Sequence, residues 1–208
     1  ADRVAQVAAD IEAAGGRALA VPTDVTDRVA LEALADAAVN AFGHLDVWVN
    51  NAGGSSVQSP LRELSEADWD ACLALNLTAV WKASVIAAKR MTRGGSIINV
   101  SSPAATRAVP GSGHYSAAKA GVNALTLTMS VELAPHIRVN GIAPGFVPTE
   151  VMMTALGTDE EALARMAEKR IPLKRLGTPD DMASAALYLA SDAGSWVTGQ
   201  TITVAGGL

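Results

Sequence analysis

Residues 96–119 read Ser-Ile-Ile-Asn-Val-Ser-Ser-Pro-Ala-Ala-Thr-Arg-Ala-Val-Pro-Gly-Ser-Gly-His-Tyr-Ser-Ala-Ala-Lys. The apolar run at 96–100 predicts a strand, and residues 113–134 predict a helix. Within this helix Tyr115 and Lys119 are four residues apart, so they share one face. Ser102 comes just after the strand and can point toward the same place. The stretch therefore predicts a fold element that brings a serine, a tyrosine and a lysine together.

A tyrosine beside a lysine is a candidate proton-transfer catalyst. Free tyrosine has a pKa of about 10, so action at neutral pH requires a decrease of roughly three units, or about 4 kcal/mol. One lysine ammonium about 4 Å away supplies about 4 kcal/mol at an effective dielectric constant near 20. Tyr-x-x-x-Lys also occurs by chance on surface helices, so the rest of the chain must decide.

Composition limits the class of protein. The chain has 208 residues, of which 50% are apolar and 18% charged, as expected for one domain with a sizeable core. The net charge of −5 without a basic block argues against nucleic acid as a partner. Cys72 is the single cysteine, which excludes an intramolecular disulfide. No apolar run predicts a membrane span or a signal peptide, so we expect a cytoplasmic protein that binds no membrane.

Predicted helices and strands alternate along the chain. Strands are expected at 18–21, 45–49, 96–100, 137–142 and 201–204. Helices are expected at 3–14, 27–42, 65–92 and 113–134, and after Thr158 and Thr178. This alternation predicts an α/β fold whose parallel sheet is covered by helices on both faces.

Several unusual segments follow predicted strands. They are Asn50-Asn51-Ala52-Gly53, Ser101-Ser102, Ala143-Pro144-Gly145 and Asp24-Val25. Each alone is typical of a turn. In an open parallel sheet, however, ligands bind beyond the carboxyl ends of the strands, and these segments share that edge. We therefore expect a ligand site there.

Asn76 lies within the apolar stripe of its predicted helix, so its amide is expected to be buried and to need partners. It is either a satisfied core asparagine or a residue that holds a water beside Tyr115. No metal site is expected from the three histidines, which lack metal-ligand spacing: His44, His114 and His136. His114 directly precedes Tyr115 and is a candidate for facing a substrate.

Together these residues resemble the short-chain dehydrogenase/reductase family over essentially the whole chain. The resemblance rests on Asn50-Asn51-Ala52-Gly53, Asn76, Ser102, Tyr115-x-x-x-Lys119, Arg138-Val139-Asn140, Pro144-Gly145 and Thr198-Gly199-Gln200. It implies a Rossmann-like doubly wound parallel sheet in a single domain, 1–208, that binds NAD or NADP. Other stretches are similar to bacterial hydroxysteroid dehydrogenases and to 3-oxoacyl carrier-protein reductases.

The resemblance implies a role for each catalytic residue. Tyr115 would be the general acid/base in the interconversion of a secondary alcohol and a ketone. Lys119 would lower the pKa of Tyr115 and hold the nicotinamide ribose, and Ser102 would bind the substrate oxygen. Asn76 would position a water in the proton relay.

The resemblance also implies the cofactor and substrate contacts. The adenosine side would be lined by Asp24, Val25, Asn51, Ala52 and Gly53, and the nicotinamide side by Pro144, Gly145, Val147 and Thr149. Residues 150–172 would form a substrate lid with the apolar side chains Val151, Met152, Met153, Leu156, Met166 and Ile171. The pocket would be completed by Ser55, Ala104, Val109 and Phe146. These residues favour a lipophilic or alicyclic alcohol, unless they simply pack the lid on the core. A homotetramer would form through the helices at 65–92 and 113–134.

The chain departs from the family pattern at its start, which lies inside a predicted helix at Ala1-Asp2-Arg3-Val4. The first strand, the glycine-rich turn and the second strand, which carries the residue that selects NAD or NADP, are missing. Their loss would leave a gap of about 14 Å between the strands at 18–22 and 45–49, so we expect further residues upstream. The alternatives are a 3-oxoacyl thioester reductase of lipid synthesis, or a truncated, non-catalytic relative that acts as a binding module.

Overall fold

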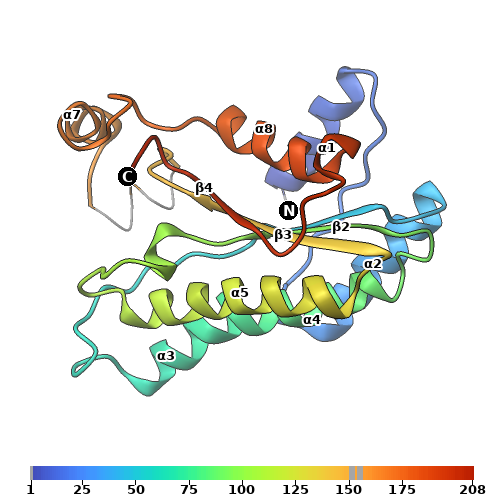
Figure 1. Cartoon of the computed structure of the whole chain (residues 1–208), viewed down its shortest axis with the longest axis horizontal. Coiled ribbons are helices and arrows are strands. Elements are labelled where there is room, and N and C mark those ends of the chain that lie inside the picture. The colour runs from blue at the N-terminus through green and yellow to red at the C-terminus, as the bar shows by residue number, and fades with distance from the viewer. Residues whose placement is uncertain (1, 150–152, 154–156) are drawn as a thin grey trace.

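The computed structural model describes residues 2–149, 153 and 157–208. Its centre is a parallel sheet with the strand order β1-β2-β3-β4 (Figure 1). The strands are β1 (Val47–Asn50), β2 (Gly95–Val100), β3 (Ile137–Pro144) and β4 (Thr201–Val204). The predicted parallel α/β sheet is confirmed.

Helices cover both faces of the sheet (Figure 1). One layer contains α2 (Arg28–Phe42), α3 (Glu66–Leu73), α4 (Ala79–Ala88) and α5 (Gly113–Glu132). The other layer contains α1 (Asp2–Ala13) and α8 (Pro179–Ala190), and α7 (Glu160–Arg170) lies near the C-terminal end of the chain. Successive side chains of a strand point to opposite faces. Accordingly Ile97 is buried in the core beneath α4, and Ile98 in a second core beneath α8.

The long helix predicted at 65–92 contains a π-helical turn, Ala74–Thr78, between α3 and α4. Such turns often occur at functional sites, and this one carries Asn76. The stretch Glu66–Ala88 is long and apolar enough for a membrane span by length and composition alone, contrary to our expectation. In the fold it packs against β1 and α5 as a core helix, which explains this composition.

The prediction of a strand at 18–21 is wrong, because these residues form no regular structure. A strand needs a neighbour to pair its backbone groups. Among the described residues, no strand pairs with the free edge of β1. Apolar side chains on this side are exposed: Leu19 is 50% exposed, Val47 39% and Val49 46%.

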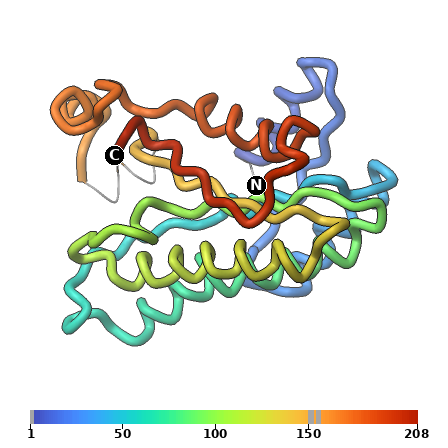
Figure 2. Tube along the Cα trace, in the orientation of Figure 1, coloured from blue at the N-terminus to red at the C-terminus, as the bar shows by residue number. Residues whose placement is uncertain are grey.

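The C-terminal segment (red) lies beside the segment that joins α7 to α8 (orange) (Figure 2). The amide of Leu173 donates to the carbonyl of Gly206 at 3.1 Å. A Cβ on Gly206 would come within 2.7 Å of Ile171, and this glycine has a φ of +64°. The two segments therefore close over the carboxyl ends of β3 and β4.

Candidate active site

Ser102 and Tyr115 meet beyond the carboxyl end of β2. Ser102 follows that strand and caps a short 3₁₀ turn, where its hydroxyl accepts a hydrogen bond from the Ala104 amide at 3.2 Å. The Ser102 side chain lies close enough to the Tyr115 phenol to lower its pKa. The structure thus brings the predicted serine into the neighbourhood of the tyrosine.

Lys119 lies one turn further along α5 and is only 3% exposed. Its Nζ lies 5.6 Å from the centre of the Tyr115 ring and donates to the Val100 carbonyl at 2.8 Å. Burial lowers the pKa of Lys119 to about 8. An ammonium has three N–H donors, and among the described residues Val100 is the partner of one of them.

The pKa of Tyr115 is raised, mainly because the phenol is buried. The nearby Ser102 side chain opposes this increase in pKa, and a negative charge on Cys72 would add to it. Lys119 therefore does not by itself bring this pKa toward neutral. The ammonium lies over the ring and is bound to Val100, so burial of the phenol dominates.

Asn76 is fully buried, and its amide holds the loop that follows β1. Its Oδ1 accepts from the Gly54 amide at 2.8 Å, and its Nδ2 donates to the Gly54 carbonyl at 2.9 Å. Nδ2 also donates to the Cys72 carbonyl at 3.0 Å. Both amide hydrogens of Asn76 therefore have protein acceptors.

Gly53 makes a close approach to two catalytic candidates. A Cβ at this position would lie 2.8 Å from Oδ1 of Asn76 and 3.3 Å from Nζ of Lys119. Only glycine leaves room for this arrangement. The structure thus places Asn76, Lys119 and Gly53 together, as predicted from segments far apart in the sequence.

The predicted nicotinamide side lies at the end of β3, where a Cβ on Gly145 would come within 2.7 Å of Ala205. The carbonyl of Phe146 accepts from the Gly177 amide at 2.9 Å, and the amide of Thr149 donates to Val147 at 2.7 Å. A cavity of about 100 Å³ opens here; its lining includes Gly145, Phe146, Ile171, Arg175, Asp181 and Ala205.

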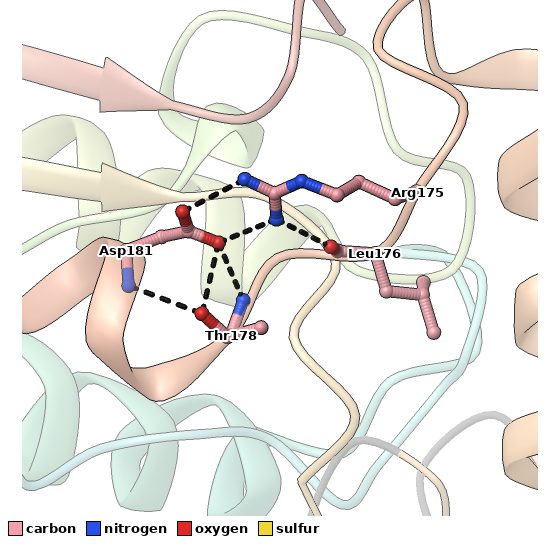
Figure 3. A network of polar contacts seen from close by, with 4 residues as sticks. All are labelled: Arg175, Leu176, Thr178 and Asp181. Carbon is pink, nitrogen blue, oxygen red and sulfur yellow. Dashed lines mark hydrogen bonds and ion pairs between the residues drawn. The ribbon is translucent and has the colours of Figure 1, made fainter.

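One wall of this cavity is held by a polar cluster at the start of α8 (Figure 3). Arg175 binds both carboxylate oxygens of Asp181, at 2.6 and 2.9 Å. Asp181 also accepts from the amide and the hydroxyl of Thr178, which completes a capping box. These contacts hold the pKa of Asp181 well below its usual range, with the Arg175 hydrogen bond as the largest cause.

The predicted adenosine side is only partly assembled. Val25, Asn51 and Ala52 line a second cavity of about 80 Å³ between β1 and α4. Asp24 is exposed and does not line it. Its carboxylate accepts two hydrogen bonds from Thr26, which lower its pKa.

The predicted lid is only partly described. Val151, Met152 and Leu156 lie outside the described residues. Met166 is half-buried on α7, and Ile171 is 2% exposed in the cavity wall. Within the described residues, no group of three or more His, Cys, Asp or Glu side chains could hold a metal ion.

Two contributors to the site are absent from the sequence-based predictions. Cys72 enters them only as a single cysteine that excludes a disulfide, whereas its carbonyl and its thiol both contact Asn76. Its spacing of i to i+4 from Asn76 was the available signal. No local sequence pattern points to Arg175, because its partner Asp181 lies across a turn.

Comparisons with known proteins identify the family to which the chain belongs. Residues 1–208 match a family model described as Enoyl-(Acyl carrier protein) reductase. The 3beta-hydroxysteroid dehydrogenase 1 of Eggerthella lenta is 43% identical over 202 residues, which cover 95% of this chain and 76% of that protein. The 3-oxoacyl-(acyl-carrier-protein) reductase FabG of Thermotoga maritima is 41% identical over 188 residues, covering 89% and 74%.

A solved structure of 7 alpha-hydroxysteroid dehydrogenase, complexed with NADH and 7-oxo glycochenodeoxycholic acid, has a TM-score of 0.91. It is 36% identical, and the match covers 100% of this chain and 80% of that one. The chain belongs to the short-chain dehydrogenase/reductase family. Its relatives in this family are oxidoreductases acting on CH–OH groups, and this chain is an enzyme of that class.

The short-chain dehydrogenase/reductase family implies NAD or NADP, and the nicotinamide half of the site fits such a cofactor. Two N–H groups of the buried Lys119 ammonium have no partner among the described residues, a donor set suited to the hydroxyls of a ribose. Gly53 and Gly145 keep the adjacent backbone open to close approach. No described turn corresponds to the glycine-rich segment expected to hold the pyrophosphate.

Proposed function

We propose that this chain is an NAD(P)-dependent oxidoreductase that interconverts a secondary alcohol and a ketone, with Tyr115 as the general acid/base. The observation that carries the proposal is that Ser102 and the buried Lys119 both lie beside Tyr115. A phenol, a hydroxyl and an ammonium are the groups needed to bind an oxygen and move its proton.

Each residue has one task. In oxidation Tyr115 accepts the alcohol proton, and in reduction it donates a proton to the oxygen that becomes the alcohol. Ser102 donates a hydrogen bond to the same oxygen, and Lys119 holds the ribose hydroxyls with its free N–H groups. When bound, the nicotinamide accepts or supplies the hydride.

Asn76 acts through the backbone that it holds. Its amide is bound to Gly54 and Cys72, so its N–H groups are not free for a water. A relay water would therefore be held by the backbone of the π-helical turn. The interrupted ladder of such a turn supports this assignment.

A lipophilic or alicyclic substrate is the first candidate. The apolar side chains of Ile171 and Met166 favour it, as do two relatives named hydroxysteroid dehydrogenases. A 3-oxoacyl thioester is the second candidate, because a relative at 41% identity is named a 3-oxoacyl-(acyl-carrier-protein) reductase.

A homotetramer remains a proposal, as does a cytoplasmic location. On the two helices expected to form the tetramer, Val80 and Val122 are buried within the chain. Leu127 is 58% exposed on α5, with Val131 at 74% beside it and Trp81 at 46% on α4. The tetramer proposal rests on these exposed apolar side chains of the two helices.

A fluorescence titration with NADH, and separately with NADPH, tests the cofactor assignment. We expect one of the two to bind and to reveal the nucleotide preference. Turnover is then compared on a hydroxysteroid, a cyclohexanol and a 3-oxoacyl thioester. Activity on the thioester alone selects the second candidate. If neither nucleotide binds this chain or a version extended upstream, the binding-module alternative replaces the enzyme.

A further inference from the structure

His114 joins two segments of the site and has no role in the proposed chemistry. It lies in the first turn of α5, directly before Tyr115, and is fully buried. Its Nε2 lies 3.0 Å from Oγ of Ser55. Ser55 belongs to the loop after β1 and follows Gly54, the residue held by Asn76.

The partners of Ser55 decide which ring nitrogen carries the hydrogen. The Ser55 hydroxyl donates to the Val57 carbonyl at 3.1 Å. A hydroxyl has a single hydrogen to donate, so its oxygen accepts the bond from the imidazole. Nε2 of His114 is therefore the nitrogen that carries the hydrogen of this bond. Nδ1 is buried, and it has no hydrogen-bond partner among the described residues.

This bond is among the attachments that hold the loop at 53–59. Asn76 holds Gly54 through two hydrogen bonds, His114 holds Ser55, and the Ser59 amide donates to the Gly111 carbonyl at 2.9 Å. Two of the attachments, at His114 and Gly111, connect the loop to α5 and the residues just before it. The loop is thus fixed to the helix that carries Tyr115.

The same loop places Gly53 against the catalytic lysine. The Cβ position of Gly53 is 3.3 Å from Nζ of Lys119, so a small shift of the loop changes the space beside the ammonium. Misplacement by about 1 Å at a distance from the chemistry can cost about a hundredfold in rate.

We propose that His114 is a positioning residue. As an Nε2–H donor to Ser55, it locks the loop at 53–59 onto α5 and thereby sets the place of Gly53 opposite Lys119. The effect on cofactor binding rests on the proposed function. The tautomer of His114 and its hydrogen bond to Ser55, called the lock below, do not.

Three variants separate this role from simple packing. The amide nitrogen of His114→Gln takes the place of Nε2 and keeps the donor, whereas the shorter side chain of His114→Asn reaches only the place of Nδ1. Ser55→Ala removes the acceptor. We expect the Kd for the preferred nicotinamide nucleotide to rise about tenfold in His114→Asn and Ser55→Ala, as for the loss of one buried hydrogen bond. In His114→Gln and in the control Ser56→Ala, at an exposed position, it stays within about threefold.

Equal Kd values for the Gln and Asn variants would overturn the positioning role, and so would a fall in Tm without any change in Kd. Long-range ¹H–¹⁵N spectra of ¹⁵N-histidine-labelled protein test the lock without any cofactor. We expect the His114 signals, identified by their loss in His114→Gln, to show protonated Nε2 and bare Nδ1. Ser55→Ala should shift them and leave His44 and His136 in place. An Nδ1–H tautomer, or no response to Ser55→Ala, contradicts the proposal even if the enzyme is active. If no nucleotide binds, the proposed function fails, and the spectra alone decide whether the lock exists.

Discussion

The side chain of Asn76 forms two hydrogen bonds with the backbone of Gly54: Oδ1 accepts from the Gly54 amide at 2.8 Å, and Nδ2 donates to the Gly54 carbonyl at 2.9 Å. A single buried side chain thus provides the loop beside Lys119 with two backbone hydrogen bonds of the kind that a neighbouring strand would make. Because the two residues are 22 positions apart, this contact ties the π-helical turn to the carboxyl edge of the sheet.

Asn76→Ala tests this contact. Leaving the two Gly54 groups without partners should lower the free energy of unfolding by about 3 kcal/mol, as measured by urea denaturation. Nucleotide affinity should fall as well, because the loop carrying Gly53 is released. The control is Asn40→Ala on the exposed side of α2, for which we expect a change of about 0.5 kcal/mol or less. Equal stability of the two variants would show that Asn76 is not a clamp.

The burial of Lys119 is expected to lower the free energy of unfolding at neutral pH. Its pKa falls from 10.5 to about 8 on folding, so the unfolded chain binds more protons between these values. Stability therefore rises as the pH increases from about 8 to 10.5. At pH 7, Lys119→Met should be more stable than the wild type by about 2 kcal/mol, after subtraction of the lost bond to Val100.

Urea denaturation of Lys119→Met at several pH values measures this effect. The difference from the wild type should shrink as the pH passes from 8 toward 10.5, and turnover should be lost at every pH. Lys89→Met, at an exposed position, should show no such dependence. A Lys119→Met protein that is less stable than the wild type at pH 7 would contradict the assigned cost of burial.

The cluster around Asp181, unlike the buried Lys119, is expected to stabilise the fold at neutral pH, and its pH dependence lies in the acidic range. The pKa of this carboxyl is lowered on folding, chiefly by the hydrogen bond from Arg175. Its contribution is therefore present above the ordinary aspartate pKa of about 4 and is lost as the pH falls below it. Asp181→Asn should lower Tm at pH 7, and the difference from the wild type should narrow at acidic pH.

Asp180→Asn is the matched control for this variant, because Asp180 lies in the same first turn of α8 and is exposed. Both substitutions remove one negative charge near the helix N-terminus, so their difference isolates the contacts with Arg175 and Thr178. The same loss of Tm in both variants at pH 7 would mean that only the helix dipole is involved.

Local patterns predicted the parts of the site that depend on one element. The i to i+4 spacing placed Tyr115 and Lys119 on one helix face, and the apolar stripe around Asn76 predicted its burial. The predicted strand at 18–21 does not form, because a strand needs a neighbouring strand to pair with, and the local sequence does not show whether that neighbour is present. The prediction that Lys119 lowers the pKa of Tyr115 toward neutral was wrong for a similar reason, because that pKa depends on where the Lys119 ammonium lies in space.

Contacts between distant segments could not be predicted from the sequence either. Asn50 donates to Ser84 and to Asn99, and Asn99 donates to Thr126, all within the buried core. Each is a polar residue in an apolar element. Only the packed fold shows that they satisfy one another, and the same holds for Ser55 and His114.

Tyr115→Phe measures the central claim most directly. The chain has two tyrosines, and Tyr188 on α8 provides a matched control because it is 42% exposed. Oxidation of a secondary alcohol is followed in both variants with the nucleotide that the wild type prefers. If Tyr115 is the general acid/base, kcat/KM falls by roughly 10²–10⁴-fold in Tyr115→Phe. Nucleotide affinity and Tm should be retained, and Tyr188→Phe should match the wild type. Wild-type turnover by Tyr115→Phe would contradict the account.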